Sequence, residues 1–255
     1  MRLLTFASYS LLSLPLAACM SSSNSGTSSS DITAPEYDDV ARNVGTSAAA
    51  PSGGDVAAMG DVALLASGTL PLGFTLGTKG TVTGSFLGIT YDFSLTCSDG
   101  QGTNLPTCGS ATELADVKVD WSGALQLPNF STTMDRHGDW SLMNLQDTSV
   151  KLAGNGTFSY DSSISNPNTT VTAAYHFDYE AAYMSVFIDK NTKLATAGEI
   201  QYDIAASKTV TGQAVRTFSL SADINFNGDG TATIDLDGIH HYKLDLATHV
   251  VIKID

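Results

Sequence analysis

The sequence predicts an all-β protein, an antiparallel meander of about ten to twelve strands folded as a sandwich or an incompletely closed barrel. Three observations lead to this fold class. Apolar and polar residues alternate along several long stretches, turn-forming residues separate these stretches, and no helical period interrupts them after about residue 66. Because strands do not alternate with helices, the parallel α/β architectures do not fit this chain.

Residues 1–18 have the features of an export signal. Met1 and Arg2 provide a short positive start, and an apolar run follows from Leu3 to Leu14. This run is shorter than the roughly 20 apolar residues that cross a bilayer as a helix. We therefore expect residues 1–18 to be a cleaved signal peptide.

The residues that end this signal are Leu16, Ala17, Ala18 and Cys19. They resemble the lipobox of bacterial lipoproteins, in which the signal is cleaved before a cysteine that then carries diacylglycerol and an acylated amine, for example a palmitate. The resemblance implies that Cys19 is the lipid attachment residue. Met20 replaces the aspartate linked to inner-membrane retention, which implies the outer membrane of a Gram-negative bacterium, on its periplasmic or its surface side. The alternative is an ordinary cleaved signal with an incidental cysteine.

The segment after Cys19 is rich in serine, glycine and alanine up to about residue 55. Such a composition buries too little apolar surface to offset the entropy of ordering the chain. The sequence therefore predicts a flexible tether over residues 19–55 and a single antiparallel β domain over residues 56–255. Residues 56–66 form a short apolar stretch that fits one or two helical turns or a first strand.

Several stretches of the β domain alternate with a period of two. The longest runs from Val117 to Leu127, where apolar residues or glycine hold every second position. The same period recurs in Ile200–Ile204 and Phe218–Phe226. Strands with this pattern bury one face and expose the other, as antiparallel strands commonly do.

Turn-forming dipeptides divide the strands. Three of them pair a residue that tolerates positive φ with a following glycine and predict hairpins: His137-Gly138, Asn155-Gly156 and Asp229-Gly230. Asp189–Lys193 and Leu246–His249 are two further candidate turns.

Two cysteines remain once Cys19 is assigned to lipid. Cys97 and Cys108 enclose a short segment rich in turn-forming residues. An even number of cysteines in an exported chain predicts a disulfide, here between Cys97 and Cys108. The alternative, a metal site with two cysteine ligands, would need further ligands at close spacing, and the neighbouring sequence offers none.

Two segments imitate metal sites. Asn225, Asn227 and Asp229 follow the first half of a calcium loop, but its closing acid is replaced by Leu236, so we interpret the segment as a β-turn. His240 and His241 would point to opposite faces of a continuous strand, so they do not converge on one ion. The sequence predicts no metal and no cofactor.

An aromatic row marks a further predicted strand, and its members occupy one face: Tyr175, Phe177, Tyr179, Tyr183 and Phe187. We interpret the row as core, because aromatic side chains bury large areas and pack well across strands. A platform for glycan or lipid is the alternative. The other face carries His176, Asp178 and Glu180, which we expect to be solvated.

Composition and motifs narrow the function. The formal charge of −14 excludes the clustered cations that nucleic-acid binding requires. No known catalytic motif occurs in the sequence. We therefore expect a non-enzymatic, lipid-anchored cell-envelope protein with a structural or interaction role, whose partner is an envelope protein, a lipid or a glycan. The alternatives are a β-sheet binding module for lipid, glycan or peptide, and a hydrolase that uses a carboxylate pair.

Overall fold

The computed structural model of the protein describes residues 31–50, 54–78, 80–86, 88–127, 130–165 and 172–254. The predicted signal peptide, Cys19 and the start of the tether lie outside these ranges. The described part contains two helices, α1 (Ala34–Ala49) and α2 (Asp55–Ala66), followed by strands. The strands are β1 (Phe74–Leu76), β2 (Thr81–Phe86), β3 (Ile89–Ser98), β4 (Leu114–Leu127), β5 (Phe130–Met143), β6 (Ser149–Ser165), β7 (Thr172–Asp189), β8 (Ala195–Val210), β9 (Arg216–Phe226), β10 (Thr231–Leu236), β11 (His240–Asp245) and β12 (Val251–Lys253).

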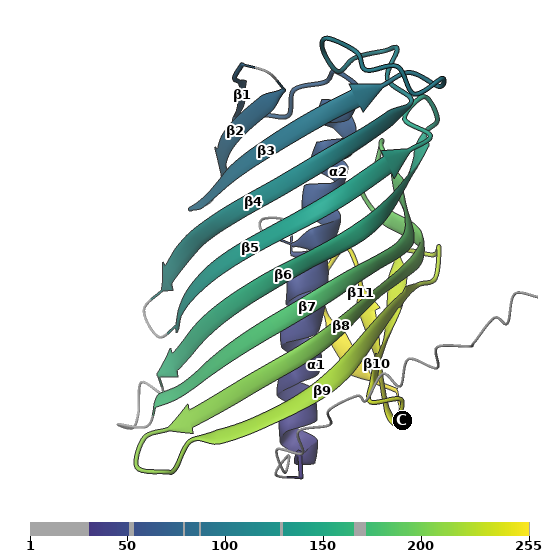
Figure 1. The fold of residues 1–255 in the computed structure, drawn as a ribbon. Helices are drawn as coiled ribbons and strands as arrows, with labels where there is room; N and C mark the ends of the chain where they lie inside the picture. Colours follow the sequence, from purple (N-terminus) through teal and green to yellow (C-terminus); the bar gives the residue numbers. More distant parts are fainter. Residues whose placement is uncertain are drawn as a thin grey trace, which may run out of the picture.

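The strands form one sheet of twelve in which each strand pairs with the next along the chain. All of these pairings are antiparallel, and β1 does not pair with β12, so the sheet is not closed into a barrel. Figure 1 shows β3–β9 as a broad, twisted layer on one side of both helices, with β10 and β11 beyond them. The predicted all-β meander is confirmed. We call the face that contacts the helices the inner face and the opposite one the outer face.

Helix α1 lies inside the segment predicted to be a flexible tether. Thr33 and Glu36 form a capping box, in which the Thr33 backbone N–H and hydroxyl donate to Glu36 Oε2 at 2.9 and 2.8 Å. One side of the helix is buried at helical spacing and faces the core: Tyr37, Val40, Ala41, Val44 and Ala48. The predicted tether over 19–55 is therefore wrong for Ala34–Ala49, because a regular apolar stripe compensates for the low mean hydropathy of the segment.

Helix α2 accounts for the apolar stretch whose structure the sequence left open. It is apolar on nearly all sides, and it contacts β3, β7 and α1 through buried residues of the core: Val56, Ala58, Met59, Val62, Ala63, Leu65 and Ala66. In the described ranges, neither helix combines the length with the apolar character that a bilayer crossing requires.

The period-two stretches face the core as predicted. Val117, Val119 and Trp121 of β4 are buried, and the alternating residues of β8 and β9 behave alike. In β7 the aromatic residues from Tyr175 to Tyr183 are buried, but Phe187 is only half-buried. The core assignment of Phe187 is wrong. A bulge after Tyr183 adds one residue to the strand, so that Val186 and Ile188 face inward in its place.

Three of the five predicted turns connect strands: Asp189–Lys193, Asp229-Gly230 and Leu246–His249. The hairpins predicted at His137-Gly138 and Asn155-Gly156 are wrong, since both dipeptides lie inside the long strands β5 and β6. Gly138 and Gly156 pair across these strands. A Cβ at Gly138 would lie 2.9 Å from Trp140 Nε1, so glycine at this position provides room for an aromatic ring.

The predicted disulfide is present. Cys97, in β3, is bonded to Cys108 in the loop that leads to β4, with 5.3 Å between the two Cα atoms. This separation lies within the ordinary range of disulfides, about 4.4–6.8 Å.

Candidate functional site

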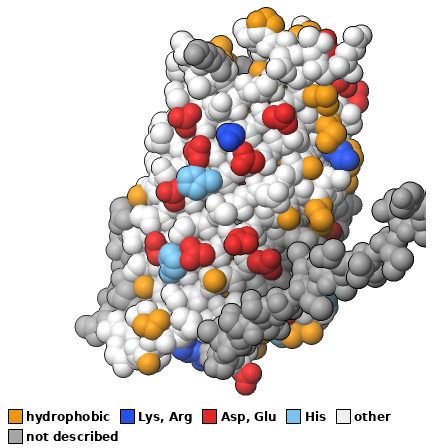
Figure 2. All heavy atoms as spheres, viewed as in Figure 1, with side chains coloured by type: hydrophobic (Ala, Val, Ile, Leu, Met, Phe, Trp, Pro, Cys, Tyr) orange, Lys and Arg blue, Asp and Glu red, His pale blue; other side chains and the backbone are white. Residues whose placement is uncertain are grey.

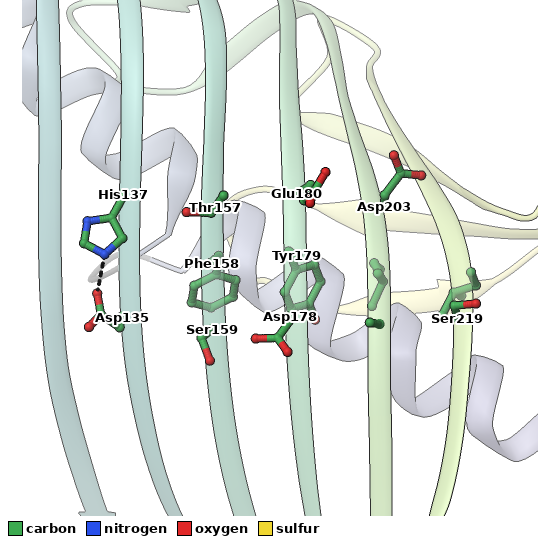
Figure 3. Close-up of a pocket in the computed structure, with 13 residues that line it drawn as sticks. Asp135, His137, Thr157, Phe158, Ser159, Asp178, Tyr179, Glu180, Asp203 and Ser219 are labelled. Carbon is green, nitrogen blue, oxygen red and sulfur yellow. Dashed lines mark ion pairs between the residues drawn. The ribbon is translucent and has the colours of Figure 1, made fainter. Parts of the chain in front are cut away.

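A groove of about 870 Å³ crosses the middle of the outer face. Residues of β5, β6, β7, β8 and β9 line it (Figure 3). The long β5–β8 ladders place these side chains in rows perpendicular to the strands. In one row His137, Thr157, Glu180 and Asp203 are successive register partners. The groove therefore depends on the pairing of strands that are distant in the sequence, rather than on any local motif.

Small side chains make the surface hollow at this place. Thr157 and Ser159 of β6, Ala205 of β8 and Ser219 of β9 contribute short side chains to a lining that also carries longer acidic ones. The larger apolar residues of the same strands point to the inner face; Tyr179, for example, is only 2% exposed. The groove is consequently polar, and exposed aromatic rings do not contribute to its lining.

A second hollow of about 420 Å³ continues the groove toward Gly138 and Gly156. It shares His137, Thr157 and Glu180 with the groove. Both glycines line this hollow, although a Cβ at either position would point to the inner side, toward Trp140 or Tyr183.

The groove is acidic. Its lining includes Asp135, Asp178, Glu180 and Asp203; among the described residues, His137 is the only basic type in the lining, which holds no lysine or arginine. Figure 2 shows acidic and histidine side chains gathered over the centre of the outer face. This arrangement creates a negative field that attracts cationic groups.

Two histidines on the outer face each lie between two aspartates. His137 contacts Asp120 across the strand pair, and its Nε2 lies 3.2 Å from Asp135 on its own strand. The hydrogen bond with Asp120 raises the pKa of His137 above its ordinary value, against the opposing effect of desolvation. His137 is therefore protonated to higher pH than a free histidine and partly offsets the acidic lining of the groove.

The second histidine repeats this arrangement. His176 Nδ1 lies 2.7 Å from Asp161 on the neighbouring strand, and its Nε2 lies 3.0 Å from Asp178. The hydrogen bond with Asp161 is the largest cause of its raised pKa. The expectation that His176, Asp178 and Glu180 are solvated holds for all three, but His176 is also bonded to two carboxylates that the sequence alone did not pair with it.

Acidic charge is in excess toward β8–β10. Partial burial and the nearby carboxylates of Glu199, Asp235 and Asp203 raise the pKa of Asp223. A carboxyl whose pKa is raised by its neighbours gains from the approach of a cation, because the cation relieves the repulsion.

A second polar cluster is enclosed between α2 and the inner face. Asp55 and Arg136 form an ion pair with side-chain exposures of 0% and 2%. Tyr183 donates its hydroxyl proton to Asp55 at 3.0 Å, and Tyr202 donates to the other carboxylate oxygen. The Arg136 guanidinium lies 3.8 Å from the centre of the Phe158 ring. Burial raises the pKa of Asp55, and the Arg136 charge opposes this shift. Because the cluster is closed to solvent, we assign it a role in fixing α2 on the sheet.

The residues that the sequence analysis considered as metal ligands do not come together in the structure. His240 packs on the Tyr37 ring, 4.1 Å between ring centres, whereas His241 contacts Asp235 across the β10–β11 hairpin. Asp229 accepts hydrogen bonds from Thr231 and closes a turn. Within the part of the chain that the structure describes, no three His, Cys, Asp or Glu side chains are grouped so as to hold a metal ion. Cys19 lies outside the described residues.

Sequence reasoning missed the groove and the buried ion pair. One feature of β5 points to the ion pair. Arg136 is an even number of residues from Trp140 and Leu142, which are both buried, so a charged side chain occupies an inward-facing position. Comparison with protein-family models, with curated proteins and with solved structures gives no match, so the site stands on its geometry alone.

Proposed function

We propose that this chain is a non-enzymatic, lipid-anchored protein of the cell envelope whose acidic groove binds a cationic segment of an envelope partner. The observation that carries the interaction role is the groove itself, a polar hollow to which the described residues of five strands contribute four carboxylates and no lysine or arginine. The lipobox resemblance at Leu16–Cys19 supports anchoring through Cys19 and a place in the outer membrane of a Gram-negative bacterium.

The geometry favours a peptide over a lipid or a glycan as ligand. The two helices fill the inner side of the sheet, and the apolar hollow between α2 and the β1–β2 edge measures about 210 Å³. This volume is below the roughly 300–1,000 Å³ of ordinary small-molecule sites. The groove lining offers no exposed aromatic ring on which a sugar could stack, whereas its carboxylates suit lysine and arginine side chains.

Lipid attachment can be tested in cells that express the full chain. We expect the parent to incorporate labelled palmitate and to fractionate with membranes, and the Cys19→Ser variant to lose both properties, because the acylated residue is removed. Mass spectrometry of the extracted parent checks the position. An unmodified chain that begins at a residue other than Cys19 would refute the anchor.

Binding in the groove can be tested with a short oligolysine peptide as probe. Removing two lining charges with Glu180→Gln and Asp203→Asn should weaken binding about fivefold to tenfold at low salt, since each exposed ion pair contributes up to about 1 kcal/mol. Isothermal titration calorimetry measures the affinity, which should also fall as salt screens the charges.

The matched control removes two exposed carboxylates elsewhere on the outer face, with Asp92→Asn on β3 and Asp116→Asn on β4. This variant has the same net charge as the groove variant. A difference in peptide affinity between the two therefore reports where the removed charges lie and not how many were removed. If both variants bind the peptide equally well, the groove is not a site and only the overall acidity attracts cations.

A further inference from the structure

The last strand exposes an aliphatic row at the edge of the sheet. β12 pairs with β11 on one side and has no strand on the other within the described residues. Val250, Ile252 and Ile254 all face outward, with 49%, 59% and 57% of their surface exposed. On the inner face, Val251 packs so closely on α1 that a Cβ at Gly45 would lie 2.5 Å from Val251 Cγ2. Val251, which is partly buried, thus anchors the strand that carries the exposed row to α1.

The hydrogen-bond pattern of β12 leaves donors and acceptors at its free edge. Ile254 donates its N–H to His241, and Val250 accepts from Asp245, so both direct their backbone groups toward β11. Ile252 is paired with Lys243 and lies two residues from both Val250 and Ile254, so its backbone groups also point toward β11. In an antiparallel ladder the intervening residues point the other way, so Val251 and Lys253 direct their N–H and C=O groups outward.

We infer that β12 pairs antiparallel with β12 of a second copy of this chain, around a twofold axis at Ile252. In this register Val251 and Lys253 of one copy exchange backbone hydrogen bonds with Lys253 and Val251 of the other, as their parity requires. Ile252 then faces its own counterpart, and each Val250 faces an Ile254. The aliphatic row is thus complementary to itself, which is what a twofold interface demands of its surface.

Self-pairing fits this strand better than a foreign strand because the symmetric register matches all three aliphatic residues at once. Such aliphatic cross-strand pairs are the units that stabilise sheets. The strand is short, so the buried area falls below that of a standard stable interface, roughly 1,200–2,000 Å² in total. We therefore expect weak, concentration-dependent association, which the charge of −14 on each copy opposes and added salt favours. The inference is independent of the groove and of the lipid anchor.

Disulfide trapping tests the axis. An Ile252→Cys variant of the full chain places two thiols at a non-hydrogen-bonded position with Cα atoms about 4.5 Å apart, within the span of a disulfide. We expect a crosslinked dimer as the main product of mild oxidation. Lys243→Cys, on the neighbouring strand and also exposed, is the control, because its copies would lie about 14 Å apart, three strand spacings.

Two further variants report the register and the contact. Val250→Cys alone should give no dimer, whereas Val250→Cys combined with Ile254→Cys should give one. In the chain without added cysteines, Ile252→Asp should weaken association about tenfold in sedimentation equilibrium, because like charges then face each other across the axis. An Ile252→Cys dimer yield no higher than that of Lys243→Cys would overturn the inference, as would unchanged sedimentation of Ile252→Asp.

Discussion

Asp55→Ala is expected to lower the free energy of unfolding by about 3–5 kcal/mol, the usual cost of removing one member of a buried ion pair. The variant leaves the Arg136 guanidinium charged and enclosed, on a side chain that is 2% exposed. It also removes the acceptor for the hydroxyls of Tyr183 and Tyr202. Urea unfolding followed by tryptophan fluorescence measures the loss, since Trp121 lies beside Arg136.

Asp61→Ala is the matched control for this experiment. Asp61 is also on α2 and is also ion-paired, with Lys193 at 2.6 Å, but both side chains reach solvent. Exposed pairs contribute about 0–1 kcal/mol, so this variant should unfold close to the parent. Equal losses for Asp55→Ala and Asp61→Ala would show that the buried pair has no special importance.

A double variant separates the contribution of the ion pair from the penalty of leaving one buried charge unpaired. In Asp55→Ala with Arg136→Met the buried charge is absent, and we expect part of the stability to return, because apolar replacements of buried pairs are often neutral or stabilising. If the double variant is less stable than Asp55→Ala alone, the Arg136 charge is satisfied by groups other than Asp55, such as the Phe158 and Trp121 rings.

The fold class follows from residue spacing, because alternation is a local property. Val117, Val119 and Trp121 identify an inward face without knowledge of any other strand. The disulfide was predictable for a similar reason, since only Cys97 and Cys108 remain once Cys19 is assigned. Both inferences depend on residues that are close in the chain or few in number.

The errors arise where tertiary packing overrides a local signal. Asn155-Gly156 has the composition of a hairpin turn, yet the β5 and β6 ladders run through it and Gly156 lies against Tyr183. Helix α1 was missed because the prediction used the mean composition of the segment. Alanine, glycine, serine and threonine lower its mean hydropathy, and the apolar stripe is recognised only when residues are compared at a period of 3.6. Single-residue spacing, rather than mean composition, would have revealed it.

The candidate site lay beyond sequence reasoning because its members come from separate strands. Asp135 and Glu180 share the groove through the registers of β5, β6 and β7, and each register is set by pairing along the whole strand. Arg136 and Asp55 are 81 residues apart. Once β5 is known to run unbroken through His137-Gly138, the burial of Trp140 and Leu142 marks Arg136 as a charge at an inward position. The sequence still does not give the partner that neutralises it.

Phe177→Ala is expected to cost about 3–5 kcal/mol of unfolding free energy, from lost burial and from the cavity that remains. Phe177 is fully buried on the inner face of β7. Its ring lies 5.8 Å from that of Tyr175 and 5.9 Å from that of Tyr179, centre to centre, so the sheet cannot readily collapse into the space. Thermal melts and urea unfolding measure the change.

Phe187→Ala on the same strand supplies the comparison. Phe187 follows the bulge that reverses the facing of β7 and is only half-buried, so the same truncation should cost clearly less than at Phe177. If the aromatic row were a binding platform, as the alternative interpretation held, both variants would melt with the parent. A Phe177→Ala midpoint within error of the parent would therefore refute the core assignment, whereas a large loss at Phe177 with a small one at Phe187 would locate the change of face at the bulge.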